Sequence, residues 1–146
     1  MIAVVAGILL RDGKILLAQR KEAAAFALKW EFPGGKIEPE ESPEEALERE
    51  LQEELGIHTH TGRIFDAVRL ENAQRDLLLL FYFSALSNGE PRALDCHALR
   101  WVAPADLLQY DLAPADRRVA EKLAALPGNL LRNRLDRADL ISLCDN

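Results

Sequence analysis

The sequence is poor in the features that mark secreted and membrane proteins. Its 146 residues include only two cysteines, Cys96 and Cys144, which lie far apart and form no CxxC pattern. We expect two free thiols in a reducing compartment, and therefore a cytoplasmic protein. No apolar run reaches the ~18 residues of a membrane span, so no membrane partner is expected. The apolar first ten residues lack a basic leader and a small-residue cleavage site, and they predict a strand.

Positive charge is also scarce, with 18 Lys and Arg against 24 Asp and Glu and a formal net charge of −6. A nucleic-acid polymer binds best to a basic surface, so this balance argues against such a partner. It does not exclude a small phosphorylated ligand, because metal ions can screen a local acidic cluster. The length favours a single domain, and both a monomer and a homodimer stay open.

Apolar runs separated by turn signals outline a mixture of strands and helices. The runs Ala3–Leu10 and Ile15–Ala18 flank an Asp-Gly turn signal and predict a buried hairpin. Three later segments predict further strands: Ile64–Leu70, Leu77–Leu86 and Leu99–Val102. The segment Pro114–Leu126 has one apolar face and predicts a helix.

The stretch Gly35–Ile57 predicts a single capped helix. Ser42 suits the N-cap, Pro43 suits the first helical position, and Glu45 completes a capping box. Gly56 suits the left-handed position that ends a helix. An apolar stripe recurs every fourth residue and should face the core, at Leu47, Leu51 and Leu55.

Three carboxylates, Glu50, Glu53 and Glu54, share the arc beside that stripe. Like charges at this spacing repel, so the helix does not need them for stability. Mg²⁺ and Mn²⁺ prefer carboxylate and carbonyl oxygens, and a Pro33–Gly35 turn with positive φ angles could present such a carbonyl. The alternative is a solvated acidic face on which Arg49 makes local ion pairs.

The same stretch resembles the Nudix box, GX5EX7REUXEEXGU, in which U is a bulky aliphatic residue. Every defined position matches, from Gly35 through Glu41 to Arg49–Ile57. The preceding Trp30–Lys36 segment also resembles the MutT-type branch of the Nudix hydrolases. The resemblance implies an α/β/α sandwich with a mixed sheet and a loop-helix-loop catalytic motif.

We expect this Nudix domain to span residues 1–127. Residues 128–146 form a tail in which apolar residues alternate with charges. The tail suits an amphipathic helix or an unordered end, and the implied fold does not need it.

The resemblance also implies the metal site. Glu50, Glu53 and Glu54 would bind Mg²⁺, or Mn²⁺ as the alternative, with the Gly34 carbonyl as a further ligand. Related enzymes add an acidic residue from the loop before the last strand, and Asp95 is the candidate here. The alternative for Asp95 is an ordinary solvated loop residue.

By the same resemblance, Glu41 and Arg49 hold the loop-helix-loop in shape, and Glu50 is a candidate to orient or deprotonate water. The implied reaction is attack of water on a nucleoside triphosphate, at the β-phosphorus, giving the monophosphate and pyrophosphate. Arg20 and Lys36 are the cations best placed to meet phosphates, or else are exposed strand-end charges. The candidate base-binding residues are Gln19, Leu28, Arg75 and Asp116.

Asp116 bears on the choice of base. In MutT-type enzymes the matching Pro-Ala is followed by Asn, which pairs with 8-oxoguanine. An ionised Asp only accepts hydrogen bonds, and a protonated Asp can also donate one. An amino-bearing base edge would suit such a group. Asp at this position resembles the CTP pyrophosphohydrolase subgroup, and the resemblance implies pyrimidine and some oxidised purine nucleotides as substrates. The alternative is that Asp116 merely caps the last helix.

The expected function is hydrolysis of (d)NTPs, CTP- or dCTP-like or 8-oxo-dGTP, in the sanitation of the nucleotide pool. One alternative is another Nudix substrate, such as a dinucleoside polyphosphate or a nucleotide sugar. The other is a non-catalytic nucleotide sensor, against which the intact glutamates speak.

Overall fold

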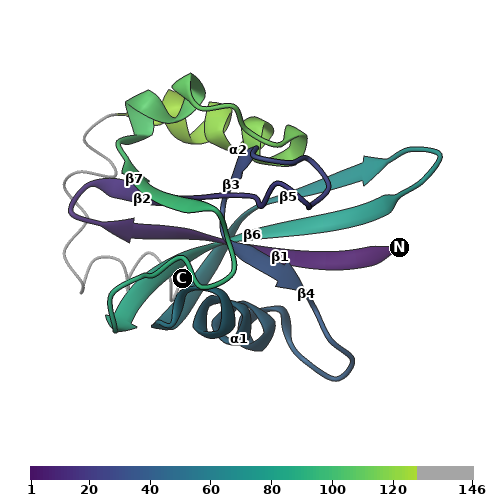
Figure 1. Cartoon of the computed structure of the whole chain (residues 1–146), viewed down its shortest axis with the longest axis horizontal. Coiled ribbons are helices and arrows are strands. Elements are labelled where there is room, and N and C mark those ends of the chain that lie inside the picture. The colour runs from purple at the N-terminus through teal and green to yellow at the C-terminus, as the bar shows by residue number, and fades with distance from the viewer. Residues whose placement is uncertain (128–146) are drawn as a thin grey trace.

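The computed structural model describes residues 1–127, which form a mixed sheet with a helix on each face (Figure 1). The strands run in the order β3-β2-β1-β6-β5, while β4 pairs with β1 and β7 pairs with β2. The strands are β1 (Ile2–Arg11), β2 (Lys14–Gln19), β3 (Trp30–Glu31), β4 (Gly34–Lys36), β5 (His58–Glu71), β6 (Asp76–Asn88) and β7 (Ala98–Val102). The helices are α1 (Pro43–Leu55), the 3-10 helix η1 (Pro104–Gln109) and α2 (Pro114–Ala125).

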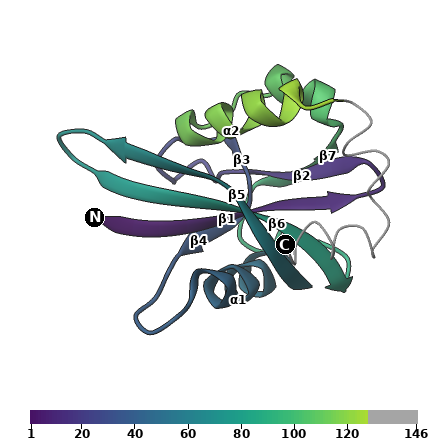
Figure 2. The same ribbon diagram turned by 180° about the vertical axis from the view of Figure 1, so that it is seen from behind.

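Two hydrophobic clusters, one on each face of the sheet, hold the layers together. Along β1, Val5 and Leu9 pack in the cluster that contains the apolar stripe of α1. The alternate residues Ile8 and Leu10 pack in the cluster that contains Val119 of α2. The view from behind shows the two helices on opposite sides of the sheet (Figure 2). The predicted α/β/α sandwich is therefore confirmed.

The sheet is mixed because β1 lies parallel to β6 and antiparallel to β2. The predicted first hairpin is confirmed, with Leu10 opposite Ile15. Strand β5 is longer than the predicted Ile64–Leu70, since it begins at His58. Its pairing with β6 shifts register three times, and these irregularities disrupt the alternation of apolar and polar residues that would have revealed the strand.

The segment Trp30–Ile37 connects the two sides of the sheet. Strands β1 and β2 pair only next to their turn, at Leu10 and Arg11 of β1. Farther along, β3 pairs with β2 and β4 pairs with β1, and the N–H of Gly7 donates to the Pro33 carbonyl at 2.8 Å. Phe32 packs in the cluster under α2, whereas Ile37 packs against the cluster under α1. One short segment thus reaches both helical layers (Figure 1).

The expected Pro-Gly-Gly turn is wrong, because Gly34 and Gly35 lie in β4 and have no positive φ angle. The glycines are required for space. A Cβ on Gly34 would overlap the backbone of Val5 and Ala6, against which β4 pairs. The close approach of two strands, not a left-handed backbone, selects glycine here.

The predicted tail, residues 128–146 with Cys144, lies outside the described residues. Cys96 is a free, half-buried thiol, as expected. Within residues 1–127, no helix is long and apolar enough to cross a membrane.

Candidate active site

The sequence of α1 sets the helix in place at both ends. The N–H of Glu45 donates to Ser42 Oγ at 3.1 Å, and the N–H of Ser42 donates to Glu45 Oε1 at 3.2 Å. The helix ends at Gly56, whose φ is 69° and whose N–H donates to the Gln52 carbonyl. Both predicted caps are confirmed, and the predicted apolar stripe is fully buried, at Leu47, Leu51 and Leu55. The adjacent arc of α1, with Glu50, Glu53 and Glu54, is therefore held beside this buried stripe.

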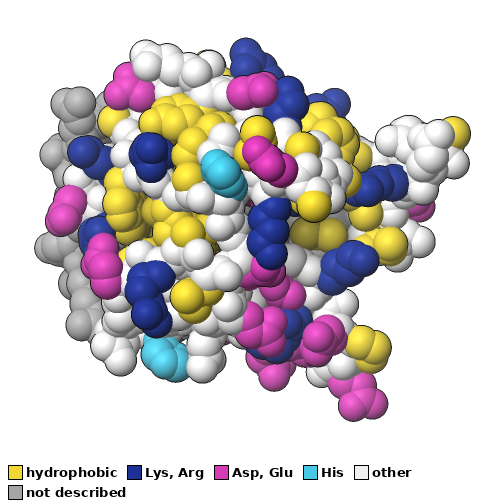
Figure 3. Space-filling view, viewed as in Figure 1, with side chains coloured by type: hydrophobic (Ala, Val, Ile, Leu, Met, Phe, Trp, Pro, Cys, Tyr) yellow, Lys and Arg dark blue, Asp and Glu magenta, His cyan; other side chains and the backbone are white. Residues whose placement is uncertain are grey.

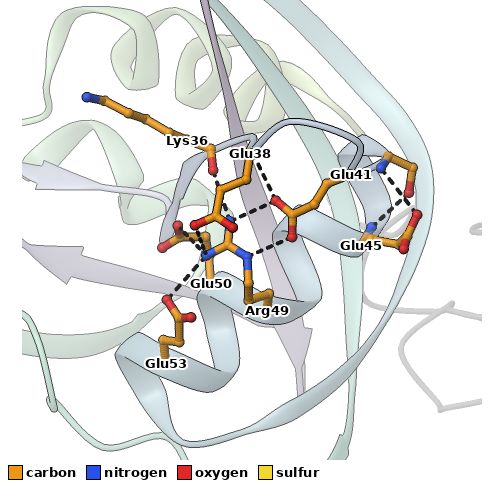
Figure 4. A network of polar contacts seen from close by, with 8 residues as sticks. Lys36, Glu38, Glu41, Glu45, Arg49, Glu50 and Glu53 are labelled. Carbon is orange, nitrogen blue, oxygen red and sulfur yellow. Dashed lines mark hydrogen bonds and ion pairs between the residues drawn. The ribbon is translucent and has the colours of Figure 1, made fainter.

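Arg49 is the centre of a polar network that joins α1 to the loop before it (Figure 4). Its guanidinium donates twice to the Glu41 carboxylate, at 2.7 and 2.9 Å, and once to the Lys36 carbonyl at 3.1 Å. It also donates to Glu50 at 3.0 Å and to Glu53 at 3.2 Å. The bond from Arg49 lowers the pKa of Glu41. This geometry supports the bracing role predicted for Arg49 and Glu41.

Gly35 gives the Glu50 carboxylate its position against β4. A Cβ on Gly35 would overlap the Glu50 carboxylate, so an alanine here would displace that group. Glu50 is half-buried, and desolvation raises its pKa while Arg49 opposes the rise. A carboxylate held in this way is suited to accept a proton from water.

Glu54 lies at the centre of a group of like charges. Burial raises its pKa to about 8, and the charges of Glu50, Glu31 and Asp95 add to the rise, against a lowering by Arg20. A divalent cation would reverse this repulsion. Four carboxylates supply the hard oxygen ligands that Mg²⁺ and Mn²⁺ prefer, so the chemistry of the cluster fits such an ion.

The predicted metal ligands do not converge as they stand. Within residues 1–127, no three His, Cys, Asp or Glu side chains form a group that could hold a metal ion. Glu50 and Glu53 are instead bonded to Arg49. Asp95 is bonded to Lys21, although its backbone N–H donates to the Glu54 carbonyl at 3.3 Å. Metal binding would therefore require these carboxylates to exchange a cationic side chain for the ion.

A cavity of about 300 Å³ runs from this cluster to α2. Gly34, Gly35 and Lys36 line it at the end near Glu54. Its other walls are mainly apolar and come from β1, β6, the β3–β4 segment and the start of α2. In the space-filling view, acidic side chains gather at the lower right, where α1 and the preceding loop lie in Figure 1 (Figure 3). The cavity thus has one charged end and one mainly apolar end.

Asp116 lines the apolar end and is only 4% exposed. Its Oδ1 accepts a hydrogen bond from the Phe32 N–H at 2.9 Å. Burial raises its pKa to about 8, and the charge of Glu31 adds to the rise. The N-cap of α2 is Ala113, and no side chain caps this helix. The capping alternative for Asp116 is therefore wrong, since its bond joins α2 to the segment that leads into β4.

The other predicted binding residues divide into two groups. Arg20 and Arg75 line the cavity, and the Arg75 guanidinium lies 6.0 Å from the centre of the Phe26 ring, between the β5–β6 turn and the loop after β2. Gln19 and Leu28 do not line it. Gln19 Nε2 donates to the Leu28 carbonyl at 3.1 Å, so this bond joins the end of β2 to the loop that follows it.

Sequence reasoning missed Glu31, which lines the cavity between its two ends. Arg20 Nη1 donates to Glu31 Oε2 at 2.9 Å. Burial raises the pKa of Glu31, with Arg20 opposing the rise. In addition to burial, its negative charge raises the pKa of both Glu54 and Asp116. The available signal was an acidic residue between two aromatic residues, Trp30 and Phe32.

The chain is similar to known proteins over most of its length. The NUDIX domain model matches residues 1–123. A CTP pyrophosphohydrolase of Escherichia coli is 46% identical over 126 residues, which cover 86% of this chain and 93% of that protein. An 8-oxo-dGTP diphosphatase of E. coli is 36% identical and covers 79% of this chain and 89% of its own length. The solution structure of the E. coli ORF135 protein has a TM-score of 0.75 at 45% identity, with coverage of 86% and 90%.

Proposed function

The chain belongs to the NUDIX domain family, and on that premise we propose that it is a hydrolase that cleaves nucleoside triphosphates to the monophosphate and pyrophosphate. The observation that carries the proposal is one cavity with two different ends. Glu54 and Lys36 line one end, and the buried carboxyl group of Asp116 lines the other. A triphosphate suits the first end and a nucleobase suits the second.

Members of this family generally depend on a divalent metal. In this chain Glu50, Glu53 and Glu54, with the Gly34 carbonyl and Asp95, would hold it, and Mg²⁺ is the first choice before Mn²⁺. The ion would neutralise the charge that develops on the phosphoryl oxygens. All five ligands offer oxygen atoms, and Gly34 is adjacent to the glycine that leaves room for Glu50.

The remaining groups at this end act on phosphate and water. Lys36 and Arg20 line the cavity and supply the positive charge that attracts a triphosphate to an acidic protein. Glu50 is positioned to orient the attacking water and to take its proton.

Asp116 is the proposed base-recognition group. With a pKa of about 8 it is mostly protonated at pH 7, so it presents an O–H donor as well as acceptor oxygens. One oxygen is committed to the Phe32 N–H. The rest of the carboxyl group can donate to a ring nitrogen or carbonyl when protonated, and accept from an exocyclic amine when ionised.

The candidate substrates follow from the relatives and from Asp116. CTP, dCTP and their modified forms present both an amine and ring acceptors, and 8-oxo-dGTP is the substrate named for the second relative. We propose that the enzyme acts on free nucleotides, not on a nucleic-acid polymer, in the cytoplasm. Removal of modified nucleotides from the pool is the proposed role.

The test is a Mg²⁺-supported panel of CTP, dCTP, 5-methyl-dCTP, 8-oxo-dGTP, oxidised dATP, a nucleotide sugar and a dinucleoside polyphosphate, with the products separated by chromatography. We expect monophosphate and pyrophosphate from at least one triphosphate, with little turnover of the last two compounds. Reaction in H₂¹⁸O should place the label in pyrophosphate if water attacks the β-phosphorus. The proposal fails if no triphosphate releases pyrophosphate, or if the nucleotide sugar or the dinucleoside polyphosphate is cleaved fastest.

A further inference from the structure

Two consecutive cations at the end of β2, Arg20 and Lys21, contact the two carboxylates that flank Glu54. Arg20 Nη1 donates to Glu31 at 2.9 Å, and Lys21 Nζ donates to Asp95 Oδ1. The charges of both carboxylates act on Glu54, so both belong to its electrostatic surroundings. The Glu54 cluster therefore already has cationic partners from its own chain.

Asp95 is fixed next to Glu54 by the backbone. The N–H groups of Leu94 and Asp95 both donate to the Glu54 carbonyl, at 3.1 and 3.3 Å. On the other side, the N–H of His97 donates to the Gln19 carbonyl at 2.8 Å, which ties this loop to the end of β2. Asp95 therefore stays beside the cluster whether or not Lys21 is bonded to it.

Arg20 and Lys21 are held with different firmness. Arg20 also donates from Nε to the Ala25 carbonyl at 2.6 Å, so its guanidinium is fixed by two partners. Lys21 is half-exposed and makes its ion pair with Asp95 at the surface. Exposed pairs of this kind are weak and are readily screened. A divalent ion in the cluster can therefore displace Lys21 from Asp95 more easily than it can displace Arg20 from Glu31.

We propose that Lys21 occupies Asp95 in the metal-free protein and gives it up when a divalent ion binds, so that Lys21 sets the metal affinity of the site. This inference rests on the proposed function, because it takes Asp95 to be a metal ligand. It assigns a role to a residue that no motif marks. The ammonium group lowers metal affinity in two ways, since it competes for the carboxylate and repels the incoming cation.

The test is a titration of the nucleotide-free protein with Mn²⁺ alone, followed by the electron paramagnetic resonance of the free ion. Replacing Lys21 with Met keeps much of the side-chain volume and removes the charge, and it should lower the Kd for Mn²⁺ by about threefold to tenfold. Lys21→Arg keeps the charge and should leave the Kd unchanged or raise it. Lys29→Met is the matched control, because Lys29 is at the other end of the same loop and pairs with Asp111.

A double-mutant cycle with Asp95→Asn decides whether the effect passes through Asp95. We expect Asp95→Asn to weaken Mn²⁺ binding, and Lys21→Met to add at most a small tightening in that background. An unchanged Kd in Lys21→Met, or the same tightening in the presence and absence of Asp95, would overturn the inference and leave the proposed function intact. A wild-type protein that bound no Mn²⁺ and released no pyrophosphate would overturn the proposed function itself. Thermal unfolding of each metal-free variant checks that the fold is retained.

Discussion

The two ends of the cavity are built in different ways. The end lined by Glu54 and Lys36, where we propose that the triphosphate binds, is called the phosphate end, and the end lined by Asp116 is called the base end. The phosphate end comes largely from one continuous stretch, in which Arg49 reaches Glu41 eight residues back and Lys36 thirteen residues back. The base end comes from distant segments, because the bond between Phe32 and Asp116 joins residues 84 apart in sequence. The local sequence therefore specifies the phosphate end, where the proposed reaction takes place. Tertiary packing specifies the base end, where the nucleobase would be recognised.

Glu41 and Asp116 are two carboxyl groups in different surroundings. Glu41 is bonded to Arg49, which lowers its pKa. Asp116 lies in the interior without a bonded cation, and burial raises its pKa to about 8. Near pH 7 Glu41 is thus an anion, whereas Asp116 is mainly a neutral acid. The first suits an ion or a cationic partner, and the second suits a base edge.

The largest expected effect is at the phosphate end. We expect Glu53→Gln to lower kcat by at least about a hundredfold with little loss of stability, because metal-borne charge stabilisation is worth several kcal/mol. Glu48→Gln is the matched control, since Glu48 lies on the same helix and accepts a bond from Thr61 Oγ1 instead of Arg49. Steady-state kinetics on the preferred nucleotide would measure both. Near-normal turnover in Glu53→Gln would remove this residue from the catalytic set.

The adjacent glycines of β4 should respond differently to the same substitution. Gly35→Ala is expected to lower kcat by about tenfold or more with the fold retained, since the new methyl group meets the Glu50 side chain. Gly34→Ala meets the Val5 backbone, and is expected to lower the melting temperature before any effect on chemistry is measurable. Kinetics and thermal unfolding of both variants would test the contrast. An unchanged kcat in Gly35→Ala would mean that Glu50 does not need the space beside Gly35, and equal losses of stability would mean that both glycines serve the strand pairing.

The contrast between the two ends also explains which features of the site could be predicted from the sequence. The caps at Ser42 and Gly56 and the carboxylate arc of α1 follow from residue type and spacing, so they were predicted. Glu31 was missed because its importance depends on Arg20 and on the two ends of the cavity, none of which adjoins it in sequence. The conformation of Gly34 and Gly35 was predicted wrongly, because a glycine selected for space and one selected for a positive φ look the same in a sequence.

Stability should depend on pH through Asp116. Its folded pKa of about 8 lies above the ordinary value of 3.8, so the folded protein binds a proton that the unfolded chain has lost between these values. This contribution to stability is complete below about pH 4 and is lost as the pH rises toward and through 8. Asp116→Asn removes it, and Asn can still accept the bond from the Phe32 N–H.

We therefore expect the free energy of unfolding of the wild type to fall relative to Asp116→Asn, by on the order of 1 to 3 kcal/mol between pH 5 and pH 8. Urea unfolding of both metal-free proteins at the two pH values measures this difference. Using the difference between variants cancels the titration of Glu54, whose pKa is raised in the same direction. Parallel pH profiles for the two proteins would show that Asp116 is ionised in the fold.

The smallest expected effect is on selectivity between nucleotides. It tests directly whether the two ends of the cavity act separately. Asp116→Asn keeps the acceptor toward Phe32 but replaces the titratable O–H with an amide that always donates. The ratio of kcat/KM for CTP to that for 8-oxo-dGTP should change by about fivefold to tenfold, in line with one altered hydrogen bond. Glu53→Gln should lower both values and leave their ratio unchanged, because both nucleotides bring the same triphosphate to that end. A shifted ratio in Glu53→Gln, or an unchanged one in Asp116→Asn, would mean that the two ends do not act separately and that Asp116 serves only to hold α2 on Phe32.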